Sequence, residues 1–284
     1  MIKRCVYILF GAALLAGCSP LAMLSAVSPS GHYERVADLQ YGDDERHFLD
    51  VYQPVTVDGD APLVVYFYGG GWNDGDKAEF EFVASSLAKA GLVVAIPDYR
   101  LYPEVTFPAY VVDSAKATAW IMSNASQFGA DSDRTYLMGH SAGAQIAALL
   151  ALDNRYLELA GVDSMKIVGL LGLSGPYDFL PLWEDNYLRE VFPEATREQS
   201  QAINFVSAAA PATLLIHGGD DDIVEPGNSV RLAAKLQAAN VAVTLKNYAG
   251  VGHGRVVVAL APPLDFIAAT LDDCIAFIKT RESQ

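Results

Sequence analysis

The stretch Thr135-Tyr-Leu-Met-Gly139-His-Ser141-Ala-Gly143-Ala-Gln-Ile-Ala-Ala-Leu-Leu-Ala-Leu152 decides the fold. Its first residues, Thr135 to Met138, are apolar or β-branched and predict a buried strand, whereas Ala142 to Leu152 predict a helix. Between them the chain must turn sharply, and only small residues on both sides of Ser141 allow the strand and the helix to approach so closely. The sequence therefore predicts a strand, a tight turn and a helix, with Ser141 on the turn.

The same alternation of strands and helices extends outward from this turn. Strands are expected at 63–68, 92–96, 167–173, 213–216 and 241–248, and helices at 79–90, 109–124, 229–239 and 264–279. Such alternation indicates βαβ units, and hence a mostly parallel twisted sheet with helices on both faces. Arg35 to Tyr52 predicts an antiparallel hairpin at the sheet edge. With no internal repeat or linker, residues 31–284 are expected to form one α/β domain.

Residues 178–210 interrupt this rhythm between two expected strands. The segment carries large aromatic side chains, among them Trp183, Tyr187 and Phe192. In sheets of this kind the chemistry gathers beyond the carboxyl ends of the strands. We therefore expect 178–210 to be a small helical cap inserted over the mouth of the site.

The N-terminus has the features of an export signal. Lys3 and Arg4 precede an apolar run that ends at Leu15, and small residues follow up to Cys18. Leu15-Ala-Gly-Cys18 also resembles the lipobox of bacterial lipoproteins. The sequence thus predicts a lipoprotein signal peptide at 1–17, lipidation of Cys18, and a tether at 18–30.

An uncleaved membrane anchor is the alternative, because apolar residues continue through 21–27. A spanning helix needs about 20 apolar residues, and Ser19-Pro20 interrupts this run. Ser19 after the cysteine resembles the outer-membrane sorting pattern. We therefore expect an exported protein, anchored by lipid in the outer membrane and facing the periplasm.

Charge and cysteine content limit the partners, disulfides and cofactors that we expect for this protein. With 34 acidic and 19 basic residues, the net charge is −15, which disfavours nucleic acid and anionic membranes as electrostatic partners. Beyond the expected signal and Cys18, only Cys274 remains, so no intramolecular disulfide is available. No His, Cys or Asp cluster has metal-ligand spacing, and we expect neither a metal nor an organic cofactor.

A serine becomes a strong nucleophile only beside a base that a third group orients. Two histidines follow Ser141. His253 lies in Gly250-Val-Gly-His-Gly254, a loop after an expected strand, whereas His217 ends a strand and fits a structural histidine that bonds the acid-bearing loop. An acid between Ser141 and His253 has three adjacent candidates, Asp220 to Asp222, and spacing does not choose among them.

An oxyanion requires backbone N–H donors close to the serine. The amide of the residue after the nucleophile, Ala142, is one, and an upstream strand-to-helix loop usually supplies the others. Gly69-Gly70-Gly71 follows the strand expected at 63–68. Because glycine lets N–H groups close on an oxygen, this loop is the candidate.

Several motifs together carry a family resemblance. In chain order they are Tyr68-Gly-Gly-Gly-Trp72, Pro97-Asp-Tyr-Arg-Leu101 with Pro103-Glu104 and Phe107-Pro-Ala109, Gly139-His-Ser-Ala-Gly143, His217-Gly218 leading to Asp221, and Gly252-His-Gly254. From about residue 34 to 280 the chain resembles the carboxylesterase branch of the α/β-hydrolases. That branch includes hormone-sensitive-lipase-like esterases, feruloyl and acetyl-xylan esterases (BD-FAE-like) and kynurenine formamidase-like enzymes.

The resemblance assigns roles to particular residues. It implies a triad of Ser141, His253 and Asp221, and an oxyanion hole formed by the amides of Gly70, Gly71 and Ala142. Many relatives carry histidine in place of Tyr68, where the side chain braces the glycine loop, and a tyrosine hydroxyl is able to do the same.

The expected reaction is hydrolysis of carboxylic esters, of small molecules or linked to polysaccharide, through a covalent acyl-enzyme. An amidase, formamidase or peptidase on the same triad is the alternative, and a catalytically inactive binding module is a further one.

Residues around these motifs receive weaker assignments. Trp72 is a candidate substrate contact beside the glycine loop. Tyr102, Tyr177 and Trp183 are further candidates, although buried aromatic residues usually serve packing. Asp98 and Arg100 follow a strand end and are expected to form a structural ion pair or a loop brace.

Overall fold

A computed structural model describes residues 20–56, 60–182 and 186–282. Its centre is an eight-stranded sheet in the order β1-β2-β4-β3-β5-β6-β7-β8. β1 (Tyr33–Gln40) and β2 (Phe48–Pro54) form the expected antiparallel edge hairpin, and β2 also runs antiparallel to β4 (Val93–Pro97). The remaining neighbours are parallel. The predicted mostly parallel α/β fold is confirmed.

The parallel strands lie in the middle of the molecule. They are β3 (Ala61–Phe67), β5 (Ala130–His140), β6 (Ile167–Leu173), β7 (Ala212–Gly218) and β8 (Val243–Tyr248). β7 is buried along its whole length, and β3 and β6 are nearly so. Helices cover both faces of these strands, which explains their continuous apolar sequences.

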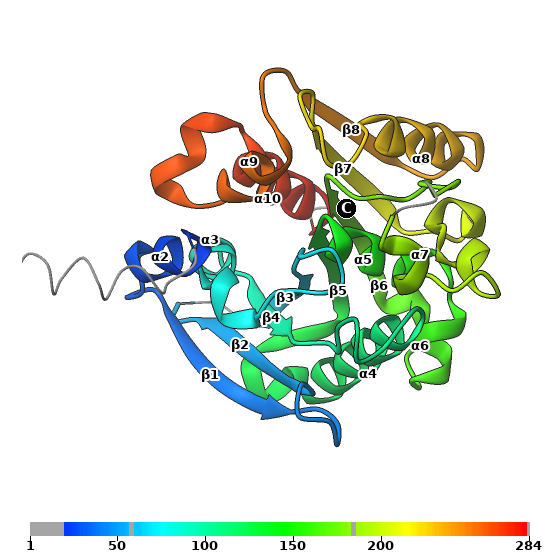
Figure 1. Cartoon of the computed structure of the whole chain (residues 1–284). Helices are drawn as coiled ribbons and strands as arrows, with labels where there is room; N and C mark the ends of the chain where they lie inside the picture. Colours follow the sequence, from blue (N-terminus) through cyan, green and yellow to red (C-terminus); the bar gives the residue numbers. More distant parts are fainter. Residues whose placement is uncertain (1–19, 57–59, 183–185, 283–284) are drawn as a thin grey trace, which may run out of the picture.

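Helices pack on the two faces as separate groups (Figure 1). α3 (Glu81–Lys89) contacts α10 (Thr270–Glu282) on one face, whereas α4 (Ala109–Asn124) contacts α5 (Ala142–Leu152) and α6 (Arg155–Leu159) on the other. α8 (Gly227–Ala238) packs against β7 and β8. Every residue of α5 is buried, because strands lie on one side of it and neighbouring helical segments on the other.

Short helical pieces fill the segment between β6 and β7. They are α7 (Leu188–Val191), η4 (Arg197–Ser200) and η5 (Ala202–Phe205), and η5 contacts α5. These helices lie within the segment for which the sequence predicts a cap. Further 3₁₀ segments are η1 (Lys77–Phe80), η2 (Ala125–Phe128) and η3 (Ser164–Lys166).

Two helical boundaries after β8 differ from the prediction. Residues 262–267 form the 3₁₀ segment η6, and Ala268 is extended with φ −161° and ψ 152°, so α10 begins only at Thr270. His253, expected in a loop, is instead the first residue of the short helix α9 (His253–Val258). Gly252 ends the loop in an extended conformation directly before it.

The N-terminal end of the described chain is helical. Residues 20–27, within the segment predicted as a tether, form α2 (Pro20–Val27), which contacts η1 and α3. The predicted signal peptide at 1–17 and the predicted lipidation site Cys18 lie outside the described residues. Within the described ranges, no helix combines the length and apolar character that crossing a membrane requires.

Candidate active site

Ser141 occupies the tight turn between β5 and α5. Its backbone is held at φ 55° and ψ −123°, a strained conformation for a residue other than glycine. A Cβ on Gly139 would lie 2.3 Å from the Gly143 carbonyl oxygen, and one on Gly143 would lie 2.0 Å from that of Phe67. The small residues of the motif are therefore required by the close approach of α5 to β5 and β3.

Ser141, His253 and Asp221 form one hydrogen-bonded row. His253 Nε2 lies 2.8 Å from Ser141 Oγ, and His253 Nδ1 lies 2.8 Å from Asp221 Oδ2. All three side chains come from the carboxyl ends of strands: β5, the turn after β7, and the segment after β8. The structure thus brings together the three residues that the resemblance assigned to the triad.

Asp221 is fixed by partners on both of its oxygens. Oδ1 accepts hydrogen bonds from the amides of Ile223 (3.1 Å) and Val224 (2.9 Å). Oδ2 faces His253 and also His217 Nε2 at 3.2 Å. Burial opposes ionisation, but the hydrogen bonds from His217, His253 and Val224 outweigh it and hold the pKa of Asp221 well below its usual range. Asp221 is therefore a carboxylate at neutral pH.

The other acid candidates do not share this position. Asp220 and Asp222 are exposed, and Asp220 accepts a bond of 3.3 Å from the Gly250 amide. His217 lies where a structural histidine was expected, because it bonds the Val224 carbonyl (3.0 Å) in the loop that carries Asp221.

His140 is a residue whose contact with the site sequence reasoning missed. Its Nε2 lies 3.2 Å from the His253 carbonyl oxygen, to which it donates, since a carbonyl only accepts. Burial is the largest cause and the nearby His253 the second, and they lower the pKa of His140 to about 3. The ring of His140 is therefore neutral near pH 7. The available signal was its place directly before Ser141 in the motif. His140 ties the backbone of His253 to the serine turn.

The glycine loop after β3 has a conformation that requires glycine at Gly70. Its φ is +135°, and a Cβ there would lie 2.1 Å from the Asp74 carbonyl oxygen. The amides of Asn73 (3.1 Å) and Asp74 (3.0 Å) both donate to the Gly70 carbonyl and close the turn. Gly71 follows with φ +60° and lines the space beside Ser141.

Tyr68 braces the base of this loop. Its buried hydroxyl donates to Asp98 Oδ1 at 2.6 Å and accepts from Arg46 Nη2 at 2.9 Å. The expectation of an ion pair between Asp98 and Arg100 is wrong, because Arg100 instead makes bonds of 2.8 and 2.7 Å to Asp113 on α4. Asp98 serves as the brace partner of Tyr68.

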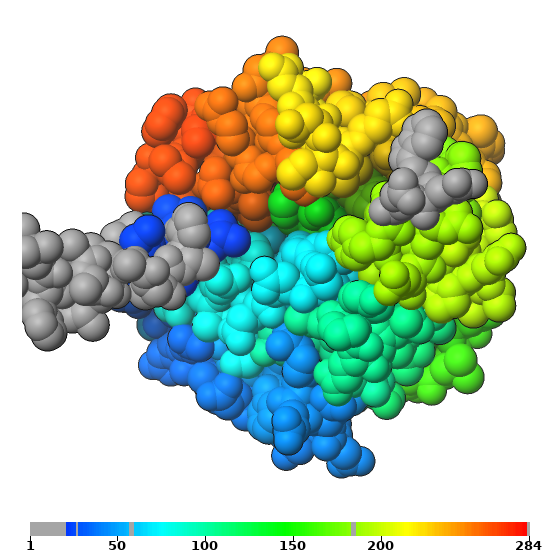
Figure 2. All heavy atoms as spheres, in the orientation of Figure 1, coloured from blue at the N-terminus to red at the C-terminus, as the bar shows by residue number. Residues whose placement is uncertain are grey.

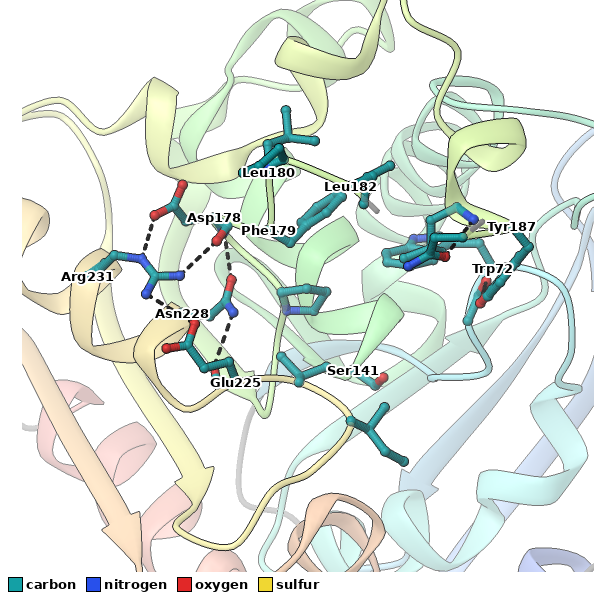
Figure 3. Close-up of a pocket in the computed structure, with 17 residues that line it drawn as sticks. Trp72, Ser141, Asp178, Phe179, Leu180, Leu182, Tyr187, Glu225, Asn228 and Arg231 are labelled. Carbon is teal, nitrogen blue, oxygen red and sulfur yellow. Dashed lines mark hydrogen bonds and ion pairs between the residues drawn. The ribbon is translucent and has the colours of Figure 1, made fainter. Parts of the chain in front are cut away.

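Two cavities meet at Ser141. The first, about 580 Å³, extends under the cap segment, and the second, about 680 Å³, extends along α9; both are lined by Gly71, Ser141 and Ile223. Figure 3 shows the first, with Phe179, Leu180 and Leu182 on one side and charged groups at its far end. Those charged groups are Asp178, Glu225 and Arg231, whose Nε lies 2.5 Å from Asp178 Oδ2.

The aromatic residues considered as substrate contacts differ in whether they line this first cavity. Trp72 lines it and is 4% exposed, with Nε1 donating to Gln145 Oε1 at 3.2 Å. Tyr187 also lines it, and its hydroxyl donates to the Gly71 carbonyl at 3.1 Å. Tyr102 and Tyr177 do not line it, and Trp183 lies outside the described residues.

No group of three or more His, Cys, Asp or Glu side chains in the described ranges is arranged to hold a metal ion.

The family model for BD-FAE matches residues 49–236. The chain belongs to the BD-FAE family. This confirms the resemblance drawn from its motifs, since residues 49–236 contain four of the five motifs.

Two curated relatives of this BD-FAE family chain carry enzyme names. The isoprenylcysteine α-carbonyl methylesterase ICME of Arabidopsis thaliana is 32% identical over 234 residues, covering 75% of this chain and 55% of that protein. The kynurenine formamidase of Salmo salar is 30% identical over 194 residues, covering 68% and 63%. The chain thus spans little more than half the length of these relatives.

Solved structures agree with the fold. The chain is similar to esterase B from Lactobacillus rhamnosis with a TM-score of 0.82 and 21% identity, covering 100% of this chain and 97% of that one. At this identity the likeness concerns the α/β-hydrolase fold alone.

Proposed function

We propose that this BD-FAE family protein is a carboxylic-ester hydrolase that works through an acyl-enzyme on Ser141. The observation that carries the proposal is the row from Asp221 through His253 to Ser141, with 2.8 Å at each step. A nucleophile, a base and an orienting acid in hydrogen-bond contact are what serine catalysis needs. Membership of the family supports the choice of esters.

Acylation begins when Ser141 Oγ attacks the ester carbonyl carbon and His253 Nε2 takes its proton. Asp221 accepts from His253 Nδ1–H, which fixes the tautomer and stabilises the imidazolium. The tetrahedral intermediate then collapses, the bond to the alcohol oxygen breaks, and His253 gives its proton to that oxygen. The alcohol leaves, and the acyl group remains on Ser141.

The amides of Gly70, Gly71 and Ala142 stabilise the negative oxygen that forms during this attack. Ala142 is the first residue of α5, where N–H groups have no partner within the helix. Each such donor is typically worth ~10²–10³ in rate. Water, deprotonated by His253, then attacks the carbonyl carbon of the acyl-enzyme. The bond between that carbon and Ser141 Oγ breaks, His253 returns the proton to Oγ, and the carboxylic acid is released.

A fluorophosphonate probe and a serine variant test the proposal. The probe is expected to label Ser141 in the folded protein, and Ser141→Ala is expected to lower kcat for p-nitrophenyl acetate by on the order of 10⁶. A folded wild-type protein that neither reacts with the probe nor hydrolyses the ester would be a binding module instead.

Amide cleavage is the second candidate function, and the similarity to a kynurenine formamidase supports it. The same row of side chains serves both reactions, because His253 can donate its proton to the nitrogen of a leaving amine as well as to the oxygen of a leaving alcohol. Comparing kcat/KM for p-nitrophenyl acetate, N-formylkynurenine and an aminoacyl anilide separates the two. Much faster reaction of either amide would overturn the esterase assignment.

We also propose that the protein is exported and held at the outer membrane by lipid on Cys18. The lipobox-like sequence Leu15-Ala-Gly-Cys18 supports this. Labelling of cells with radioactive palmitate is expected to mark the wild-type protein and not Cys18→Ser. Labelling of both proteins, or of neither, contradicts the proposal.

A further inference from the structure

The two cavities that meet at Ser141 differ in whether His253, the residue that protonates the leaving group, lines them. The second cavity is lined by His253 together with its neighbours Gly252 and Gly254. The first cavity touches Ser141 and Gly71 but is not lined by His253. An ester bound across Ser141 thus has one part beside His253 and the other part away from it.

The chemistry of the leaving group distinguishes these two parts. When the ester bond breaks, the alcohol oxygen must receive the proton held on His253 Nε2, and proton transfer requires hydrogen-bond distance. The carbonyl carbon remains on Ser141, and its acyl chain needs no contact with His253. The alcohol oxygen therefore has to lie beside His253, at the cavity that His253 lines, whereas the acyl chain has no such requirement.

Resting on the proposed esterase function, we propose that the second cavity binds the alcohol part of the ester and that helix α2 determines how long an apolar alcohol it accepts. The acyl chain then occupies the first cavity, under the cap segment.

Leu21 of α2 forms part of the wall of the alcohol cavity. The other apolar walls come from Phe80, Ile223, Val257 and Val258, and the lining is predominantly apolar. In Figure 2 the dark blue surface of α2 lies beside the cyan segment of the glycine loop and near the orange segment that holds α9. Leu21, near the start of the described chain, thus lines the same cavity as the glycine loop and His253.

α2 is fixed in this position by specific bonds. Ser25 Oγ donates to the Glu79 carbonyl at 2.9 Å and accepts from the Phe82 amide at 3.3 Å. Leu21 and Leu24 pack against the main hydrophobic core. The helix therefore supplies a defined wall to the cavity, and the size of residue 21 limits the space available.

The charged residues that line this cavity further limit which alcohols it is expected to accept. The charged residues that line this cavity are Asp74, Glu79 and Asp222 against the single cation Arg255. This excess of acids disfavours an anionic alcohol part such as a phosphorylated or carboxylated one. Together with the apolar walls, it points to esters of uncharged, apolar alcohols.

Two substrate series test the assignment on full-length protein. The alcohol series is methyl, butyl and hexyl acetate, and the acyl series is methyl acetate, butanoate and hexanoate, with acid release followed in a pH-stat. Leu21→Trp is expected to lower the kcat/KM ratio of hexyl to methyl acetate by at least ~10-fold, because lost space for one methylene already costs about that much. Leu21→Ala is expected to raise this ratio, and in both variants the acyl ratio stays as in the wild type.

Two variants serve as controls. Met23 lies on the same helix, does not line the cavity and is 40% exposed, so Met23→Trp is expected to leave both ratios and the basal activity unchanged. Leu182 lines the first cavity, so Leu182→Trp is expected to lower the ratio of the acyl series and not that of the alcohol series.

The assignment is overturned if Leu21→Trp lowers the acyl ratio instead, if it alters neither ratio, or if Met23→Trp reproduces its effect. Failure of the esterase proposal looks different. In that case the wild-type protein hydrolyses no member of either series, and Ser141 is not labelled by a fluorophosphonate.

Discussion

Replacing Asp221 with asparagine is expected to reverse the tautomer of His253 while leaving the loop intact. Asp221 Oδ1 already accepts from the amides of Ile223 and Val224, at 3.1 and 2.9 Å. These N–H groups require an oxygen, so the asparagine carbonyl takes that position and its NH₂ group takes the place of Oδ2. That place lies 2.8 Å from His253 Nδ1. Nδ1 must then accept, and the ring proton moves to Nε2.

His253 with a proton on Nε2 cannot remove the proton of Ser141, whose Oγ lies 2.8 Å away. Loss of the correct tautomer in a serine triad costs ~10⁴ in kcat, which corresponds to about 5.5 kcal/mol of transition-state stabilisation. Initial rates on p-nitrophenyl acetate at pH 7.5 measure the loss. A thermal melt establishes that the variant is folded. A moderately lower Tm is expected, because the new NH₂ group faces His217 Nε2, which lies 3.2 Å from Oδ2 in the wild type, although His217 keeps its 3.0 Å bond to the Val224 carbonyl.

The neighbouring acids are matched controls because they are chemically identical and exposed. Asp220→Asn and Asp222→Asn are expected to retain wild-type kcat within about 3-fold. The reasoning is refuted if folded Asp221→Asn keeps more than a tenth of the activity. It is refuted equally if Asp222→Asn loses as much.

Three further changes test the surroundings of the site. The pKa of His140 is about 3 in the folded protein. Because an unfolded histidine titrates near 6.5, the contribution of His140 to stability is full above that pH and falls as the pH is lowered. His140→Gln should therefore remove about 2.5 kcal/mol of the stability loss between pH 7 and 4.5, measured by urea unfolding. An unchanged loss contradicts this. Gly143→Ala should lower Tm strongly, because its Cβ would lie 2.0 Å from a β3 carbonyl oxygen. Gly254→Ala is the control and should not lower Tm, because no atom lies within 4 Å of a Cβ at that position. Equal melting temperatures of the two variants would exclude the close approach. Tyr68→Phe leaves buried Asp98 without one donor and should cost about 1–3 kcal/mol of unfolding free energy, and a cost below about 0.5 kcal/mol would mean that the hydroxyl is no brace.

The parts of the fold that follow from local sequence were predictable. The strand, turn and helix around Ser141 depend on short-range patterns, and α5 has the predicted bounds Ala142–Leu152. The spacing of acids was not enough to choose among 220–222, because the direction of each side chain depends on partners in other segments. Family resemblance selected Asp221, and the structure brings that residue to His253. Its catalytic role stays a prediction.

Long-range contacts explain what the sequence did not reveal. Arg100 pairs with Asp113 on α4 rather than with its near neighbour Asp98. Leu21 lines a cavity beside Ser141, although 120 positions separate the two in the chain. Neither contact has a local pattern, since each depends on how helices pack against the finished sheet.

The position of Ser141 between two cavities has a consequence for the second half of the reaction. Under the proposed assignment of the two cavities, the acyl chain still occupies the first cavity once the alcohol has left, and the second cavity is free to admit the next molecule beside His253. The molecule that releases the acyl group must therefore enter through a space with predominantly apolar walls. Such walls favour an added alcohol over water as the acceptor. In mixed solvents the acyl group is then expected to partition between free acid and a new ester, and the alcohol that best fits the wall formed by α2 sets that ratio.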